Sequence, residues 1–484
     1  MGSFGEVPEH LLELAVDSWH GETRAFAAER GLTAVHIELD RAFRAEHLVV
    51  RETMTGGLAD ASARLGELAA ALSPITYGGV SSRLFTTSTG DGPGDWEHRL
   101  AVALPDESVA TILDLTDIAA RHDARLWRED GVAGRVVVAR HTRIGRAESH
   151  RRFTALLADL GAHDVLDARA WHVSRPQSLI GTHLRWHVPT GDRPRIPATS
   201  VAAGTPGVPA TYLPIPGVEH RAVFDPALKQ FPEAYRHGEP GFTDPDLAGR
   251  WRAHRRAALA HVLGLVATSD LADSLVLRGS AAMRAWFPET AREPGDLDFV
   301  VMPASREAGP ELLDALREAV RANPGPGLDG SHAPMEDIWT YERAEGRRVV
   351  FPVRAEGLPE SRVQVDVVFG ENLPIPPEPL TVDGETLWAA TAELSLAWKL
   401  QWLHTDMWPQ GKDLYDAVLL AEHTTVDHGL VRDLLRPELG ERADAWTPVS
   451  VLGLMPDWPN LRDEDPSVPG ELDGWLRRLA RALA

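Results

Sequence analysis

Apolar and polar residues alternate in short runs from about residue 31 to residue 173, and segments with helical periodicity separate these runs. The runs TAVHIEL and HLVVRETM favour strands because every second residue is apolar, whereas GLADASARLGELAAAL favours an amphipathic helix. A similar order of strands and helices returns from EHRLAVAL onward. We therefore expect residues 1–175 to form an α+β domain of the ferredoxin-like, split βαβ type, either as a single unit or as a duplicated one.

Regular periodicity ends near residue 176, and prolines then recur in a stretch rich in glycine, alanine and threonine up to residue 222. Proline fixes φ and removes a backbone donor, so residues 176–222 are predicted to be an extended linker. A second domain, residues 223–484, is expected to follow. In it, a long helix over about 246–268 precedes the apolar strand SLVLRGS, and amphipathic helices close the chain.

The length and composition agree with two domains. A chain of 484 residues exceeds what one hydrophobic core usually organises. The sequence has no stretch of eighteen apolar residues and no signal-peptide pattern at its start, so we expect a cytoplasmic protein without a membrane segment. Since it contains no cysteine, disulfides and thiolate zinc sites are excluded. Any bound metal should therefore be a hard cation held by oxygen atoms.

The charge balance is acidic, with 49 Lys and Arg residues against 71 Asp and Glu residues and a formal net charge of −22. This charge opposes broad binding along a nucleic-acid backbone but does not exclude a local basic groove. One basic cluster occurs in RWRAHRR, at Arg250, Arg252, Arg255 and Arg256. A solvated helix face is the favoured interpretation of this cluster.

The residues that indicate chemistry lie just after that cluster. The apolar run SLVL is followed by Gly279 and Ser280, and a second apolar run carries Asp296 and Asp298. Residues two apart in a strand point to the same face, so both carboxylates should lie on one side of this strand. Two carboxylates held together repel unless a divalent cation neutralises them. The pattern therefore predicts a magnesium or manganese site.

Four residues extend this prediction. Asp366 lies in the β-like run RVQVDVVFG, and a strand paired beside the Asp296 strand would add a third carboxylate. A glycine at 279 lets the backbone approach a phosphate, and Ser280 adds a hydroxyl at the start of the next helix. Arg284 lies on that helix. It would either reach the phosphates or form a surface ion pair.

The order Gly-Ser, Asp-x-Asp and a later Asp resembles the polymerase-β-type nucleotidyltransferase superfamily, and within it the AbiEii/AbiGii toxin nucleotidyltransferases. That family adds a lysine on a later helix and a basic-Asp-x-Tyr-Asp signature. Here ELSLAWKLQWLH supplies Lys399, and KDLYD supplies Lys412, Asp413, Tyr415 and Asp416. The likeness covers about residues 223–435. One departure is Pro294, which stands where the family often has a serine, whereas Arg292 matches the pattern.

The resemblance implies a polymerase-β-type fold for the second domain and an activity that moves an NMP from an NTP to an acceptor, releasing pyrophosphate. It implies that Asp296, Asp298 and Asp366 bind Mg²⁺ or Mn²⁺, and that Lys399 contacts the triphosphate. It gives Asp413 a role in supporting the site or the acceptor. It also suggests tRNA or another RNA as acceptor, and an antitoxin as partner.

Two other functions remain open at this point. One is a small-molecule or protein nucleotidyltransferase, in which the N-terminal domain recognises the acceptor. The other is a non-catalytic regulatory or RNA-binding protein, with the N-terminal domain as an inhibitor or binding module. Asp296, Asp298 and Lys399 are all intact, which argues against loss of catalysis.

If residues 176–222 are an extended connector, limited proteolysis should cleave there first and release two folded fragments. Mass spectrometry of the first products locates the cut. Resistance throughout this stretch would mean that it is packed against a domain.

Overall fold

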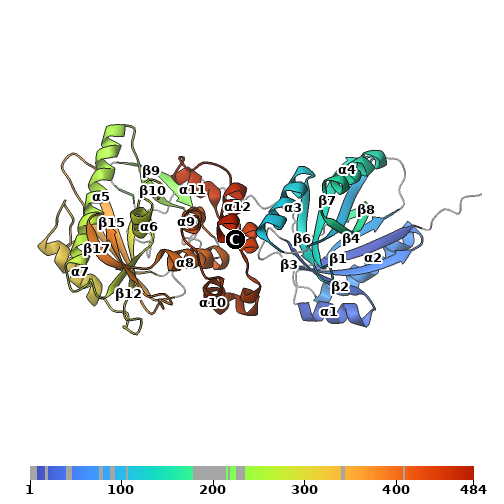
Figure 1. The fold of residues 1–484 in the computed structure, drawn as a ribbon, viewed down its shortest axis with the longest axis horizontal. Helices are drawn as coiled ribbons and strands as arrows, with labels where there is room; N and C mark the ends of the chain where they lie inside the picture. Colours follow the sequence, from blue (N-terminus) through green and yellow to red (C-terminus); the bar gives the residue numbers. More distant parts are fainter. Residues whose placement is uncertain are drawn as a thin grey trace, which may run out of the picture.

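The computed structural model of the chain describes residues 8–16, 20–39, 46–75, 80–87, 93–104, 107–177, 214–215, 218–224, 235–338, 344–406 and 409–484. A barrel and a mixed β-sheet lie at opposite ends of the molecule, and C-terminal helices lie between them (Figure 1). No helix in the described residues is long and apolar enough to cross a membrane.

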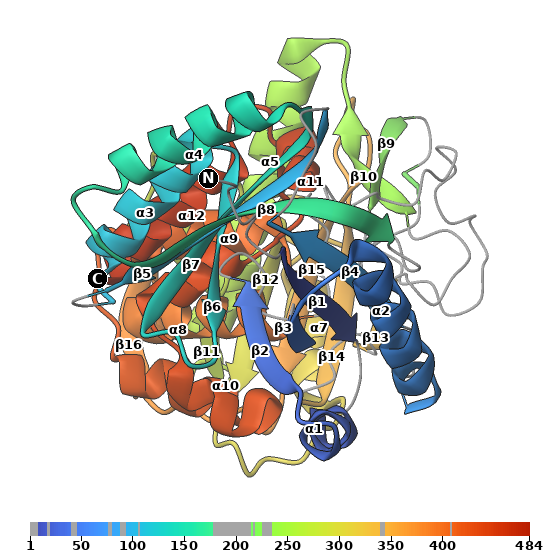
Figure 2. The same cartoon turned by 90° about the vertical axis from the view of Figure 1, so that its right-hand side faces the viewer.

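The N-terminal half contains a closed barrel of antiparallel strands in the order β1-β3-β2-β6-β7-β5-β8-β4. Its strands are β1 (Glu9–Val16), β2 (Thr33–Leu39), β3 (Glu46–Thr55), β4 (Val80–Thr86), β5 (Gly94–Ala103), β6 (Ala124–Glu129), β7 (Gly134–Ile144) and β8 (Asp164–Gln177). Its helices are α1 (His20–Glu29), α2 (Leu58–Leu72), α3 (Val109–Arg121) and α4 (Arg146–Asp159), with a 3-10 turn η1 (Ser73–Ile75). Figure 2 views the molecule from the barrel end, with these helices around the strands.

The barrel consists of two halves with the same connectivity. Each half runs strand, helix, strand, strand, helix, strand along the chain. In space the first half has the order β4-β1-β3-β2 and the second half has the order β8-β5-β7-β6. The halves join where β2 pairs with β6 and where β4 pairs with β8. Strand β1 and helix α1 were not predicted, because regular alternation of apolar and polar residues is evident only from residue 31 onward.

Buried ion pairs fill part of the barrel interior. Leu12 and Leu14 pack in the apolar cluster formed with helix α2, so the intervening Glu13 points to the other side of β1, into the barrel. Glu13 contacts Arg51 at 2.7 Å, Arg99 at 2.6 Å and Arg83 at 3.3 Å. The network continues through Glu97, Glu129 and Arg140. These arginines hold the pKa of Glu13 well below its usual value, although burial alone would raise it.

The C-terminal half contains a seven-stranded mixed sheet in the order β13-β14-β15-β12-β11-β17-β16. Its strands are β11 (Leu275–Arg278), β12 (Asp296–Val301), β13 (Met335–Asp337), β14 (Gly346–Val353), β15 (Ser361–Val368), β16 (Glu378–Val382) and β17 (Glu385–Ala389). A separate two-stranded sheet is formed by β9 (Glu219–Phe224) and β10 (Tyr235–Gly241). The helices associated with the mixed sheet are α5 (Pro245–Ala267), α6 (Ser280–Trp286) and α7 (Glu311–Ala322).

The two faces of β12 are covered by different helices. Leu297 and Phe299 point into an apolar cluster shared with α5 and α7. Val300, on the other face, packs in a cluster with Leu394 and Trp398 of α8. Because Asp296 and Asp298 alternate with Leu297 and Phe299, they lie on the face that α8 covers.

The remaining helices are α8 (Ala392–Thr405), α9 (Gly411–Ala421), α10 (His428–Leu439), α11 (Trp458–Glu464) and α12 (Leu472–Leu483), with 3-10 turns η4 (Gly440–Ala445) and η5 (Pro448–Gly453). Barrel helix α3 packs against η5 and α12. Its residues Val109, Ile112 and Leu113 belong to the same apolar cluster as the C-terminal helices. Arg477 of α12 also forms an ion pair with Asp117 of α3. The barrel and the C-terminal helices therefore share one packed core.

The structure has the mixed α and β composition that the sequence predicts. The helix expected over 246–268 is α5, and the strand expected in SLVLRGS is β11. The predicted linker at 176–222 lies mostly outside the described residues, although its edges belong to β8 and β9.

The buried pairs of Glu13 predict a large loss of stability for Glu13→Gln, about 3–5 kcal/mol, because it leaves arginines inside the barrel without their countercharge. Urea titration followed by circular dichroism measures this loss. Glu52→Gln is the control, since Glu52 pairs with Arg64 near the surface and should cost at most about 1 kcal/mol. Equal losses in the two variants would contradict the interpretation.

Candidate functional site

Three carboxylates meet on one face of the mixed sheet. Strands β12 and β15 are parallel neighbours, and Asp298 lies opposite Asp366 in their register. Asp296 precedes Asp298 by two residues and points to the same side. Each of the three offers a carboxylate oxygen, and these oxygens all lie within 4.8 Å of one another. The structure thus brings together the three acids that the sequence singled out, which we call the triad.

The electrostatics of the triad favour a bound cation. Burial raises the pKa of Asp298 to about 8, with further contributions from the negative charges of Asp296 and Asp366. Burial also raises the pKa of Asp366. Such acids are costly to keep ionised unless a positive charge lies beside them. The donors are all carboxylate oxygens, the ligands that Mg²⁺ and Mn²⁺ prefer, so these residues fit such an ion.

Gly279 and Ser280 lie directly beside the triad. Gly279 has a φ of 76°. A Cβ atom added to it would lie 2.4 Å from Oδ2 of Asp298, so no larger residue fits without a shift. Ser280 begins α6, and its Oγ is buried without a hydrogen-bond partner in the structure. This hydroxyl is therefore available to a ligand such as a phosphate oxygen.

Lys399 on α8 is buried in an ion-pair network with α9. Its Nζ lies 2.8 Å from Oδ1 of Asp413 and 3.1 Å from Oδ2 of Asp416. Burial lowers the pKa of Lys399, but the two carboxylates outweigh this effect and raise it overall. Arg292 donates to both oxygens of Asp416, at 3.2 and 2.8 Å. Lys399 is thus a fixed cation rather than a side chain that extends to solvent.

The other predicted residues have more peripheral positions. Arg284 lies 3.8 Å from Glu293, and its side chain is 34% exposed, which agrees with the surface ion pair weighed from the sequence. Arg256 of the basic cluster contacts the same Glu293 at 3.4 Å. Tyr415 donates its hydroxyl to the carbonyl of Thr290 at 2.6 Å.

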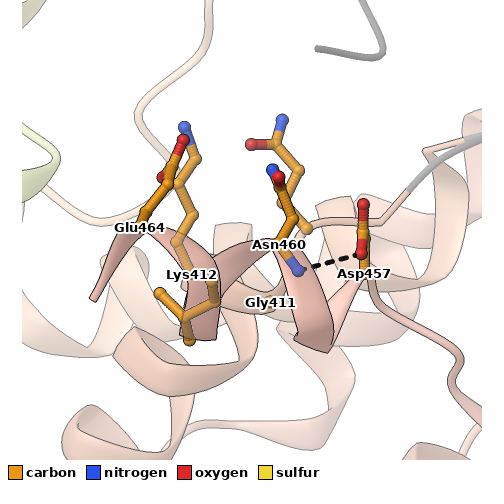
Figure 3. Close-up of a pocket in the computed structure, with 7 residues that line it drawn as sticks. Gly411, Lys412, Asp457, Asn460 and Glu464 are labelled. Atoms are coloured by element: carbon orange, nitrogen blue, oxygen red, sulfur yellow. Dashed lines mark hydrogen bonds between the residues drawn. The ribbon is translucent and has the colours of Figure 1, made fainter. Parts of the chain in front are cut away.

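Lys412 lines a small pocket between the starts of α9 and α11, together with Gln410, Gly411, Asp457, Asn460, Leu461 and Glu464. Figure 3 shows the side chains of Lys412 and Glu464 side by side and pointing the same way. The carboxylate of Asp457 accepts a hydrogen bond from the backbone of Asn460 at 3.2 Å. Lys412 therefore faces this pocket, whereas its neighbour Asp413 binds Lys399.

Sequence reasoning missed two arginines beside the triad. Arg348 of β14 donates to both oxygens of Asp366, each at 2.8 Å. Arg278 of β11 lies opposite Asp298 in the register, and its guanidinium contacts Glu371 at 2.7 Å. Arg278 could have been noticed because it directly precedes Gly279. Arg348 could not, because its place depends on how β14 pairs with β15.

The charged groups around the triad are not balanced. Six carboxylates and four cations take part, namely Asp296, Asp298, Asp366, Glu371, Asp413 and Asp416 with Arg278, Arg292, Arg348 and Lys399. With every group ionised, two negative charges remain, which a single divalent cation would balance.

Comparison with known proteins identifies this part of the chain. Residues 262–481 match the family model of the nucleotidyl transferase AbiEii toxin of type IV toxin–antitoxin systems. These residues are therefore an AbiEii-type nucleotidyltransferase domain, and the resemblance inferred from the sequence motifs is confirmed. The match begins and ends later than the 223–435 expected from the sequence. No curated protein matches the sequence of the chain.

Several solved structures are similar to parts of the chain, and two of them illustrate the extent of the similarity. An antigenic nucleotidyltransferase-like protein from Paracoccidioides brasiliensis has 15% identity and a TM-score of 0.26, over 46% of this chain and 93% of its own. A candidate monooxygenase from Fusobacterium nucleatum has 12% identity and a TM-score of 0.16, over 35% of this chain and 93% of its own.

The raised pKa of Asp298 predicts a specific pH dependence of stability when a chelator removes divalent ions. An acid whose pKa rises from 3.8 in the unfolded chain to about 8 in the folded one destabilises the fold as pH rises through that window. Thermal unfolding between pH 4 and 8 should therefore show falling stability, and Asp298→Asn should flatten this fall. Asp383→Asn, in a turn, is the control. If the stability of Asp298→Asn fell with pH as steeply as that of the wild type, the raised pKa could not be assigned to Asp298.

Proposed function

We propose that this AbiEii-type domain transfers an NMP from an NTP to an acceptor hydroxyl or phosphate, releasing pyrophosphate, with Mg²⁺ or Mn²⁺ bound by Asp296, Asp298 and Asp366. The observation that carries this proposal is the meeting of three carboxylate oxygens within 4.8 Å, on adjoining strands beside Gly279 and Ser280. The family match supports the same reaction class.

The divalent cations would stabilise the charge on the triphosphate and promote ionisation of the acceptor hydroxyl. The acceptor oxygen attacks the α-phosphorus, and the bond from that phosphorus to the bridging oxygen of pyrophosphate breaks. Asp366 lies beside Asp296 and Asp298 and would assist loss of the acceptor proton to solvent. The arginine and glutamine that donate to Asp366 would hold it in a fixed orientation during this step.

The phosphates would be bound by the groups next to the triad. The buried Oγ of Ser280 has no partner in the structure and can donate to a phosphate oxygen. Lys399 supplies a positive charge that Asp413 and Asp416 hold in place. Arg284 contributes to binding only if it leaves Glu293, which holds it weakly at 3.8 Å.

The acceptor that we favour is RNA, including the 3′ end of tRNA, which the family resemblance suggests. Exposed arginines on α5 support an RNA acceptor. One of them, Arg256, contacts Glu293, and Glu293 precedes Asp296 by three residues. The net charge of −22 opposes broad RNA binding and favours a small-molecule or protein acceptor. An antitoxin partner is proposed on the family match alone.

We interpret the barrel as a duplicated ferredoxin-like unit, because both halves repeat one connectivity and one strand order. The proposed domains are residues 1–175 and 223–484, joined by a linker at 176–222. The barrel would either recognise the acceptor or inhibit transfer. Its contact through α3 with η5 and α12 supports a fixed position beside the catalytic domain.

Incubation with labelled NTPs, Mg²⁺ and separate RNA, protein and small-molecule pools tests the proposal. We expect label in one pool, with tRNA the leading candidate, and a loss of at least about 100-fold in Asp298→Ala, because the metal and its charge stabilisation are lost. Asp383→Ala serves as the matched control. Undiminished transfer in Asp298→Ala would exclude the triad, and absence of label from every pool would favour a non-catalytic role.

A further inference from the structure

Arg348 binds Asp366 as a two-pronged clamp. Its Nε donates to Oδ1 and its Nη2 donates to Oδ2, both at 2.8 Å. Nε2 of Gln364 donates to the same Oδ2 at 3.0 Å. The side chains of Arg348 and Asp366 are only 12% and 11% exposed. Such a paired contact fixes both the plane and the rotation of the carboxylate.

The clamp restricts how Asp366 can bind a metal. A carboxylate has about four lone-pair positions, and the arginine and glutamine donors use three of them. Oδ2 accepts two hydrogen bonds, whereas Oδ1 accepts one. Asp366 can therefore offer a cation one oxygen, Oδ1, while Arg348 stays in place. Chelation by both oxygens would require the clamp to open.

Arg348 also limits the negative charge of the site. It is one of four cations that leave two negative charges around the triad. One divalent ion balances that charge, so a second ion would enter a site without excess negative charge. The triphosphate of an NTP carries several negative charges and would supply what the second ion needs.

We propose that Arg348 is a positioning residue that makes Asp366 a single-oxygen metal ligand and thereby prevents a second divalent ion from binding tightly to the nucleotide-free site. This inference rests on the proposed function. The arginine on β14 would thus determine how many divalent ions the nucleotide-free site holds.

Binding of Mn²⁺ to the full-length protein, followed by electron paramagnetic resonance of the free ion, tests the proposal without measuring activity. We expect one Mn²⁺ per wild-type chain without nucleotide, and a second with a non-hydrolysable NTP analogue. Arg348→Met should bind the second Mn²⁺ without nucleotide, at least about tenfold more tightly than the wild type does, because it adds one negative charge and frees one lone-pair position on each oxygen of Asp366.

Arg347→Met is the matched control, since Arg347 is adjacent on β14 and pairs with Asp337 and Glu345 away from the triad. It should bind Mn²⁺ like the wild type. Arg348→Lys keeps the charge but not the paired contact, so it should hold one Mn²⁺ without nucleotide while its kcat falls and its KM for NTP changes little. This variant also serves if Arg348→Met folds poorly.

Two outcomes distinguish an error in the role of Arg348 from an error in the proposed function. If Arg348→Met binds Mn²⁺ with wild-type number and affinity, or if the wild type binds two ions without nucleotide, the role of Arg348 is refuted. Asp298→Asn should lose Mn²⁺ binding. If it does not, the triad is not the metal site and the proposed function fails with it.

Discussion

Three carboxylates share one face of two adjoining strands, and their mutual repulsion is the constraint on which the surrounding structure depends. Asp298 lies opposite Asp366 in the parallel register, so the sheet itself forces the acids together. Burial raises the pKa of Asp298 to about 8, and the charges of Asp296 and Asp366 add to the rise. The protein offsets part of it with buried arginines, Arg278 on one neighbouring strand and Arg348 on the other side. What remains is a negative charge that suits a divalent cation.

The C-terminal helices extend this arrangement away from the sheet. Helix α8 covers the face that bears the triad, and its Lys399 is held by Asp413 and Asp416 of α9. Helix α9 packs against α12, which packs against barrel helix α3. The site is therefore joined to the barrel by a continuous series of packed helices. A change in the barrel has a physical route to the cation that we propose contacts the triphosphate.

Both halves of the molecule bury ion pairs, but with different consequences. In the barrel, Glu13 is surrounded by arginines that satisfy it, and its pKa is low. At the triad, acids outnumber cations and the pKa of Asp298 is high. In the first arrangement, loss of one partner would leave a charge buried without its countercharge, so the pairs must form together. The second stores electrostatic strain that a ligand relieves, which is the property expected of a functional site.

The sequence alone determined much of the catalytic half. Alternation in SLVL and DLDFVV located two strands and put Asp296 and Asp298 on one face, and motif order led to the family that the match over 262–481 confirms. These features depend on residues close together in the chain. Closure of the barrel, the pairing of β12 with β15 and the clamp of Arg348 on Asp366 were decided only by tertiary structure. Strand pairing joins residues far apart in sequence, and local periodicity contains no information about which strands will become neighbours.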